Sequence, residues 1–296
     1  MKRVMIGMAV GVIFCTSFVA STDIELGQTL MQQKKYAEAR EEFLKDMPNL
    51  KGTNAARIQL MIASTYNNEK KYAEARKEYE KVLEIEGATD AQKAQALLGI
   101  GRIVRTQEKN TDEARKYFSK VLELNDAEAV NKGNAQLEIA ATYLDDKNYE
   151  QTIKEATKVI QIEGATPLAK NRALLFIARG HKALKNYPEA LKFYMDFSAN
   201  ETNTTYLAEA HLAIGEIYFL DKKYQNAREY LSKLLADEKV PNAYKSSAHL
   251  LIARSYKEEN NNVEALKEYK NLVEAPYVSA SHKKEAEKTI KQIEGK

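Results

Sequence analysis

The chain has 296 residues, of which 44% are hydrophobic and 29% are charged, with 12 glycines, 5 prolines and no tryptophan. This composition is typical of a soluble, helix-rich protein whose turns are made by polar residues. The formal net charge of +3 at pH 7 gives no support to nucleic-acid binding or to a polybasic membrane anchor, because both depend on a large excess of basic residues.

The first 21 residues have the pattern of a secretory signal peptide. Lys2 and Arg3 precede an apolar run at residues 4–14, and small residues at 19–21 suit a signal peptidase. We expect cleavage after residue 21 and export of the mature protein. An alternative stays open: if it is not cleaved, the stretch 4–20 is at the short limit for spanning a bilayer and would hold the protein at the membrane.

Cys15 is the only cysteine and lies inside this segment. A bacterial lipoprotein needs Gly, Ala or Ser directly before its lipidated cysteine, and Phe14 stands there. We therefore expect Cys15 to be discarded with the signal. The mature chain then has no thiol, which suits an oxidising compartment and excludes disulfides and cysteine metal sites.

From residue 22 onward, one pattern recurs seven times at intervals of 36 to 39 residues. Apolar residues at helical spacing lie on both sides of a short polar turn, which predicts two antiparallel helices in each unit. Each predicted first helix carries a small residue at Gly27, Ala63, Gly101, Ala140, Ala178, Gly215 and Ala253. Each predicted second helix carries one at Ala39, Ala75, Ala114, Thr152, Ala190, Ala227 and Ala265. Small side chains at these places let the two helices approach closely.

These fourteen positions resemble the tetratricopeptide repeat family, and the resemblance covers residues 22–278. It implies an all-α, right-handed superhelical α-solenoid of about seven helical hairpins, a fold that serves mainly as a binding surface. The repeats are expected at about 22–54, 55–90, 91–129, 130–167, 168–204, 205–243 and 244–278. At 279–296, a single apolar stripe among lysines and glutamates predicts a C-terminal capping helix.

The connections show where the chain departs from the family pattern. The proline expected between hairpins is mostly missing, and Gly87 and Gly164 are expected to end helices in the left-handed conformation. Thr89 and Thr166 are the expected starts of the helices that follow. The third unit has an extra residue, which we expect in its internal turn at 106–112.

No motif in the sequence indicates catalysis or a bound cofactor. A phosphate-binding glycine loop, a His-Glu-x-x-His helix and a serine elbow are all missing, and no two of the four histidines are four residues apart. Gly99 and Gly101 lie within a predicted helix, which favours close helix packing over dinucleotide binding. We expect no catalytic residue, no metal and no cofactor. An unrecognised enzyme site, or a sugar-binding platform made by some of the 17 tyrosines, is the alternative.

The resemblance implies that ligands lie along the inner surface formed by the first helices. The same face of the predicted first helices carries a mostly basic set: Arg57, Asn67, Asn68, Arg102, Arg105, Arg172, Arg179, Lys182, Arg254 and Lys257. Glu209 and Glu216 interrupt this set, beside Phe219 and Leu220, which are expected to be exposed. We predict a protein or peptide partner with an acidic segment, because arginine pairs with carboxylates through two hydrogen bonds. The alternative is an ordinary solvated face.

The sequence thus favours an exported, non-enzymatic scaffold or adaptor in the bacterial cell envelope. In general plan it is similar to repeat proteins that serve outer-membrane protein assembly, envelope coordination or polysaccharide export. The alternative is a membrane-held subunit of an envelope assembly or of a polysaccharide export machinery. No nucleic acid is expected as a partner, and a membrane only if the signal is retained.

Overall fold

The computed structural model describes residues 19–295, and all regular secondary structure in this part is helical. Most of the expected signal peptide, with Cys15, lies outside the described residues. The chain divides into two compact units, and the boundary falls within α7, after Thr142. Each unit is described by itself below. None of the described helices is long and apolar enough to cross a membrane.

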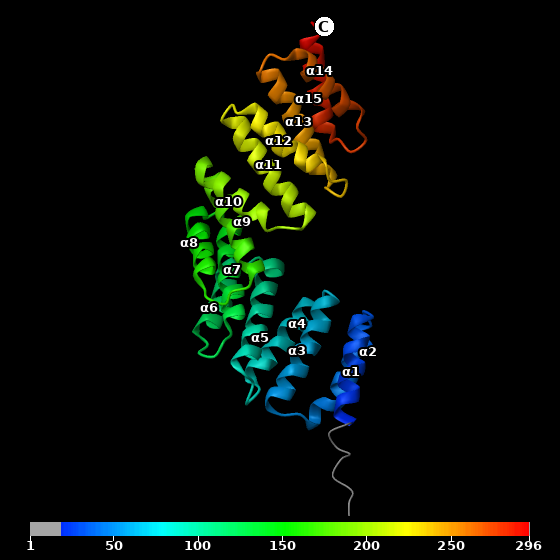
Figure 1. The fold of residues 1–296 in the computed structure, drawn as a ribbon. Helices are drawn as coiled ribbons and strands as arrows, with labels where there is room; N and C mark the ends of the chain where they lie inside the picture. Colours follow the sequence, from blue (N-terminus) through cyan, green and yellow to red (C-terminus); the bar gives the residue numbers. More distant parts are fainter. Residues whose placement is uncertain (1–18, 296) are drawn as a thin grey trace, which may run out of the picture. The chain divides into compact units, whose positions relative to one another are not determined.

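Unit 1 consists of helical pairs in chain order (Figure 1). Its elements are α1 (Val19–Gln32), α2 (Tyr36–Asp46), the 3-10 turn η1 (Met47–Asn49), α3 (Gly52–Asn68), α4 (Tyr72–Glu84), α5 (Asp90–Ile103), the π-helical turn η2 (Val104–Glu108), α6 (Thr111–Glu123) and the first part of α7 (Ala129–Asp145). Helices α1 and α2, α3 and α4, and α5 and α6 contact each other as pairs.

Unit 2 continues the same arrangement. It holds the end of α7, then α8 (Tyr149–Gln161), α9 (Pro167–Ala183), α10 (Tyr187–Ala199), α11 (Thr204–Leu220), α12 (Tyr224–Leu235), α13 (Asn242–Glu258), α14 (Asn262–Glu274) and α15 (Ala280–Ile293). The hairpins α9–α10, α11–α12 and α13–α14 stack on their neighbours, and α15 packs on α13 and α14 (Figure 1). An all-α fold of stacked helical hairpins, as expected from the sequence, is confirmed.

The two helices of a hairpin meet where a small residue faces a large one. A β-carbon added to Gly101 of α5 would lie 2.4 Å from the Phe118 ring of α6, which is too close for any side chain to be accommodated without a shift. Gly27 meets Phe43 in the same way, also at 2.4 Å. The expectation that Gly101 serves close helix packing is therefore confirmed, because the ring occupies the space that a side chain would need.

The turn inside each hairpin adopts a left-handed conformation that the sequence analysis did not anticipate. The structure has positive φ at seven described non-glycine residues, one in each turn: Lys34, Lys70, Lys109, Lys147, Lys185, Lys222 and Asn260. A β-carbon in this region costs roughly 1–2 kcal/mol. Backbone hydrogen bonds offset the cost: the Lys70 amide donates to the Asn67 carbonyl at 3.0 Å, and the Lys71 amide donates to the Tyr66 carbonyl at 2.9 Å.

The connections between hairpins largely follow the sequence. Gly87 and Gly164 have φ of 81° and 80°, so the expected left-handed helix ends are confirmed. Thr89 forms a capping box with Gln92, and the Thr166 hydroxyl accepts a hydrogen bond from the Ala169 amide. The extra residue of the third unit is accommodated in the π-helical turn η2 at the end of α5, so it begins earlier than the turn in which it was expected.

Two alanines of α4 test this packing directly. Ala75 is fully buried, whereas Ala73 is exposed two residues earlier on the same helix. We expect Ala75→Leu to lower the free energy of unfolding by about 1–3 kcal/mol through overpacking, and Ala73→Leu to change it by less than about 0.5 kcal/mol. Urea denaturation of both variants measures the difference. Equal stabilities would show that the small residue does not set the distance between α3 and α4.

Candidate functional site

The ten residues predicted to bind a partner all lie on first helices or on the turn that extends one. Unit 1 carries five: Arg57, Asn67 and Asn68 on α3, Arg102 on α5 and Arg105 on η2. Unit 2 carries the other five: Arg172, Arg179 and Lys182 on α9, and Arg254 and Lys257 on α13. Whether these residues bind a partner stays a prediction, but their surroundings are now defined.

In unit 1, two of the arginines share one carboxylate. Arg102 Nε donates to Glu138 Oε1 at 2.7 Å, and Arg105 Nη1 donates to Glu138 Oε2 at 2.6 Å. Glu138 lies on α7, the next first helix along the chain. Arg57 and Asn68 are exposed, and no ion pair involves Arg57 in the described residues. The basic face of unit 1 is therefore partly neutralised from within.

In unit 2 three of the five predicted basic residues are paired. Arg179 binds Glu209 through two hydrogen bonds, of 2.6 and 2.5 Å, and Arg254 binds Glu285 through two, of 2.7 and 2.6 Å. Lys182 pairs with Glu216. In each case the carboxylate lies on the next first helix or, for Glu285, on α15.

Charge and burial act in opposite directions on Arg179. Burial lowers the pKa of its guanidinium, and the hydrogen bonds and charge of Glu209 more than offset this, so the pKa is raised. Glu209 and Glu216, which the sequence analysis treated as interruptions of the basic face, are thus the partners of its basic residues. A glutamate about one repeat length after an arginine, on the same face, is the sequence signal that was missed.

A hollow of about 410 Å³ lies between first helices of unit 2; we call it the α11–α13 hollow. It is lined by Tyr187, Phe219, Leu220, Leu250, Leu251, Lys182, Glu216, Arg254, Ser247 and His282. Leu220 is 58% exposed, as expected from the sequence. Phe219 is partly buried, which corrects its expected exposure, because its ring packs edge-on against Tyr224 with the ring centroids 5.4 Å apart.

The charged side chains at this hollow are already paired, whereas the apolar Leu220 is largely uncovered. Lys182 is held by Glu216, and Arg254 by Glu285. The exposed Leu220 lies on α11, and the nearly buried Leu250 and Leu251 lie on α13. The free energy available to a bound group is therefore mainly that of apolar burial, about 25 cal/mol per Å².

A second set of arginines has a role that was not predicted from the sequence. Arg40, Arg76, Arg115 and Arg228 each follow the small residue of a second helix. Three of them reach a buried hydroxyl on the following first helix: Arg40 contacts Thr65 at 3.1 Å, Arg115 contacts Thr142 at 3.2 Å, and Arg228 contacts Ser255 at 2.9 Å. Arg76 instead binds Glu108 and Glu113. These arginines join one hairpin to the next, which is a structural role.

The four histidines are all in unit 2, and each contacts an aromatic ring or a hydroxyl. His181 stacks on Phe193, His211 lies edge-on to Tyr230, His249 lies near Tyr277, and His282 Nδ1 is 2.7 Å from the Ser246 hydroxyl. The described residues contain no group of three potential metal ligands.

Models of the tetratricopeptide repeat match residues 54–127 and 208–236, one segment in each unit. Both units therefore contain tetratricopeptide repeats. The matched segments contain most of α3, all of α4 to α6, most of α11 and all of α12, where the small residues Ala63, Gly101 and Gly215 were assigned from the sequence. No curated protein matches the chain in sequence.

Several solved tetratricopeptide repeat structures are similar to this protein. The C-terminal part of a repeat protein from Cytophaga hutchinsonii has 18% identity and a TM-score of 0.66, covering 88% of this chain and 97% of its own. PilF of Pseudomonas aeruginosa has 16% identity and a TM-score of 0.60, covering 80% and 98%. A repeat protein from Parabacteroides merdae has 14% identity and a TM-score of 0.57, covering 93% and 98%. At these identities the likeness shows the fold.

The burial of His211 makes unit 2 of this repeat protein sensitive to acid. Burial, and next the charge of Lys233, lowers the pKa of His211 in the folded state below its ordinary 6.5. Its contribution to stability is therefore complete above pH 6.5 and is lost as the pH falls through the folded pKa. We expect His211→Leu, which introduces the residue found at the equivalent Leu97 and Leu174, to reduce the drop in melting temperature between pH 7.5 and pH 5. Calorimetry measures this; an unchanged drop contradicts the assignment.

Proposed function

We propose that this protein is an exported, non-enzymatic scaffold of the bacterial cell envelope, built from seven repeats, that holds a protein partner on the first-helix face of unit 2. The observation that carries the proposal is the α11–α13 hollow, where exposed Leu220 stands among charged groups that are already paired. Such an apolar patch with a polar rim is the usual composition of a protein-binding surface. The apolar run at the start of residues 4–21, followed by small residues, supports export because it is typical of a signal peptide.

The structural likeness is consistent with this proposal. One similar structure is PilW, described as a widely conserved type IV pilus biogenesis factor, with 16% identity and a TM-score of 0.57, covering 74% of this chain and 93% of its own. Assembly of a surface structure is a task for a scaffold in the envelope. For this chain, we infer only the same general kind of work, in which the repeats hold other proteins.

The chemistry of the partner follows from what the hollow leaves unsatisfied. A carboxylate that approached Arg179 or Arg254 would have to replace Glu209 or Glu285, so the net gain would be small. An apolar side chain inserted beside Leu220 would bury surface without breaking any pair. We therefore propose an apolar anchor as the main contact. The acidic segment predicted from the sequence stays a second candidate, supported by Arg57, Arg172 and Lys257, which form no ion pair among the described residues.

Capture of the partner from cross-linked envelopes tests whether the α11–α13 hollow is the binding site. Leu220→Asp should reduce the captured partner by about tenfold or more, because it places a charge where an apolar group is buried. The matched control is Val263→Asp, another exposed apolar residue of unit 2, at 76% exposure, on α14 outside the hollow. Arg172→Gln with Lys257→Gln distinguishes the candidates, because these two basic residues of unit 2 form no ion pair among the described residues. A loss of capture in this variant alone would favour the acidic segment. Unchanged capture in all of them would remove the binding site from this face.

Export has its own measurement. Intact mass of the protein recovered from the envelope fraction should correspond to a chain that begins after Ser21. A chain that retains residues 1–21 in the membrane fraction would support the membrane-held alternative, and a lipidated Cys15 would overturn the proposed cleavage site.

A further inference from the structure

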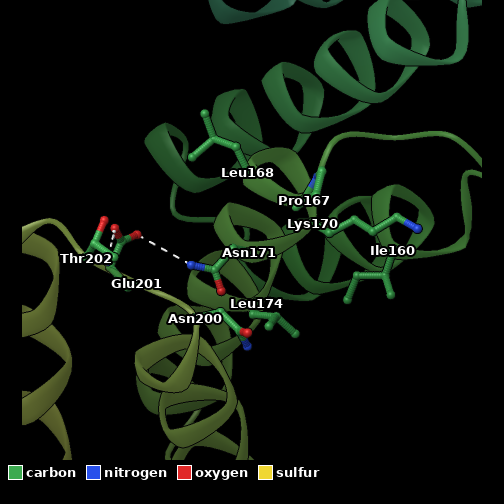
Figure 2. Close-up of a pocket in the computed structure, with 9 residues that line it drawn as sticks. All are labelled: Ile160, Pro167, Leu168, Lys170, Asn171, Leu174, Asn200, Glu201 and Thr202. Atoms are coloured by element: carbon green, nitrogen blue, oxygen red, sulfur yellow. Dashed lines mark hydrogen bonds between the residues drawn. The ribbon is translucent and has the colours of Figure 1, made fainter.

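A second hollow, of about 480 Å³, opens in unit 2 at the beginning of α9, and we call it the α9 hollow. Figure 2 shows the nine residues that line it: Ile160, Pro167, Leu168, Lys170, Asn171, Leu174, Asn200, Glu201 and Thr202. None of them lines the α11–α13 hollow. One wall is apolar and comes from the end of α8 and from α9. The other is the loop between α10 and α11.

Asn171 is the unusual residue of this hollow. At the equivalent place, seven residues before the small residue of the first helix, the other first helices have Ala20, Ala56, Ala94, Gly133, Ala208 and Ser246. Asn171 is 7% exposed. Its Nδ2 donates to Glu201 Oε2 across 3.4 Å, which is long for such a bond, and its buried Oδ1 has no hydrogen-bond partner. An unsatisfied buried oxygen destabilises the fold, so a larger polar side chain here requires an explanation other than stability.

Glu201 faces the same space. Its Oε1 accepts hydrogen bonds from the Thr202 amide at 2.9 Å and from the Asn203 amide at 2.8 Å, which hold the loop. Its Oε2 has only the long contact with Asn171, and no ion pair involves Glu201 in the described part of the chain. Lys170, the one basic residue of the hollow, extends to the opposite side, as Figure 2 shows.

The apolar wall completes the pattern. Leu168 is 62% exposed, the second-largest exposure of any large hydrophobic residue described, and Leu174 and Ile160 are partly buried beside it. The hollow thus offers the Glu201 carboxylate oxygen at one side and aliphatic surface at the other. The Asn171 oxygen, which is buried as long as Nδ2 faces Glu201, joins it only when the amide turns about its last bond. Both oxygens are acceptors, so the group that fits them must be a donor with an apolar stem.

We propose that the α9 hollow receives an arginine side chain of a partner protein. The guanidinium donates to Glu201 Oε2, and the Asn171 amide turns about its last bond so that its Oδ1 accepts a second hydrogen bond from the same group, while its Nδ2 takes the buried place that Oδ1 had. The long Asn171–Glu201 contact is thereby replaced by two hydrogen bonds that the charged guanidinium donates. The methylene stem lies along Leu168 and Leu174. Arginine suits the site better than lysine because its planar group presents several N–H donors in fixed directions.

The test uses the full ¹⁵N-labelled chain and N-acetyl-arginine methylamide as the probe, followed by NMR. The neutral analogue N-acetyl-citrulline methylamide has nearly the same shape and keeps N–H donors, so it isolates the charge. We expect the arginine probe to shift the Asn171 side-chain amide, identified by its loss in Asn171→Ser, and the backbone of residues 200–203. The citrulline probe should bind at least about tenfold more weakly.

Two variants control for the fold. Glu201→Gln keeps an oxygen that can accept from the Thr202 and Asn203 amides but removes the charge, so it should weaken the arginine probe about tenfold or more. Glu163→Gln removes an exposed carboxylate that does not line the hollow and should leave binding within about twofold. If Glu201→Gln unfolds the loop, the proposal is tested by Asn171→Ser instead, which should weaken binding of the arginine probe to a similar extent. The proposal would be overturned if the two probes bound equally, or if binding were undiminished in both Glu201→Gln and Asn171→Ser. It would also be overturned if the shifts were confined to other residues, or if a millimolar concentration of the arginine probe caused no shifts. Because the capture experiment probes a different hollow, its failure leaves this result intact.

Discussion

The contact between a small residue on one helix and a large residue on its hairpin partner is the constraint on which the other features depend. Phe118 occupies the space that a side chain at Gly101 would need, and Phe43 does the same at Gly27. In the sixth hairpin a leucine replaces the ring: an added β-carbon on Gly215 would be 2.7 Å from Leu231. Helices that approach so closely can be joined by a very short turn, and this fixes which face of each first helix is left for contacts with the next hairpin.

The short turn requires one residue in the unfavourable left-handed conformation, and the same conformation is used in each hairpin. A single residue takes the left-handed conformation, and it is lysine in six turns and asparagine in one. Glycine would adopt this conformation more easily, but it would also leave the unfolded chain with more freedom. Lysine keeps the turn soluble, while the two backbone hydrogen bonds at the helix end stabilise its geometry.

Contacts between successive hairpins use charge as well as apolar packing. Arg228 passes from α12 to α13, where it meets Ser255 and Glu259, and its guanidinium lies 4.2 Å from the centre of the Tyr256 ring. On the first-helix face, Arg179 and Arg254 hold the carboxylates of the next helix. Ion pairs of this kind, at partly exposed positions, contribute about 0.2–1 kcal/mol each. Their main effect is to remove free charge from the face, so that the α11–α13 hollow is left with its apolar surface as the distinctive feature.

The sequence alone determined the helical hairpins, the small residues where the two helices of a hairpin meet, the glycines that end helices and the resemblance to the repeat family. These features depend on local spacing and on residue size, and both can be read directly from the sequence. It also placed the basic residues on the first helices, where they lie. It could not determine that Glu138, Glu209 and Glu285 neutralise them, since those contacts join residues about 30 to 36 positions apart and depend on how the hairpins stack. Phe219 illustrates the same limit: helical spacing left it exposed, whereas in the fold its ring packs against Tyr224 and against the buried cluster that contains Leu231 and Leu251. The unpaired oxygen of Asn171 was equally invisible, because a buried group without a partner is defined by everything that surrounds it in three dimensions.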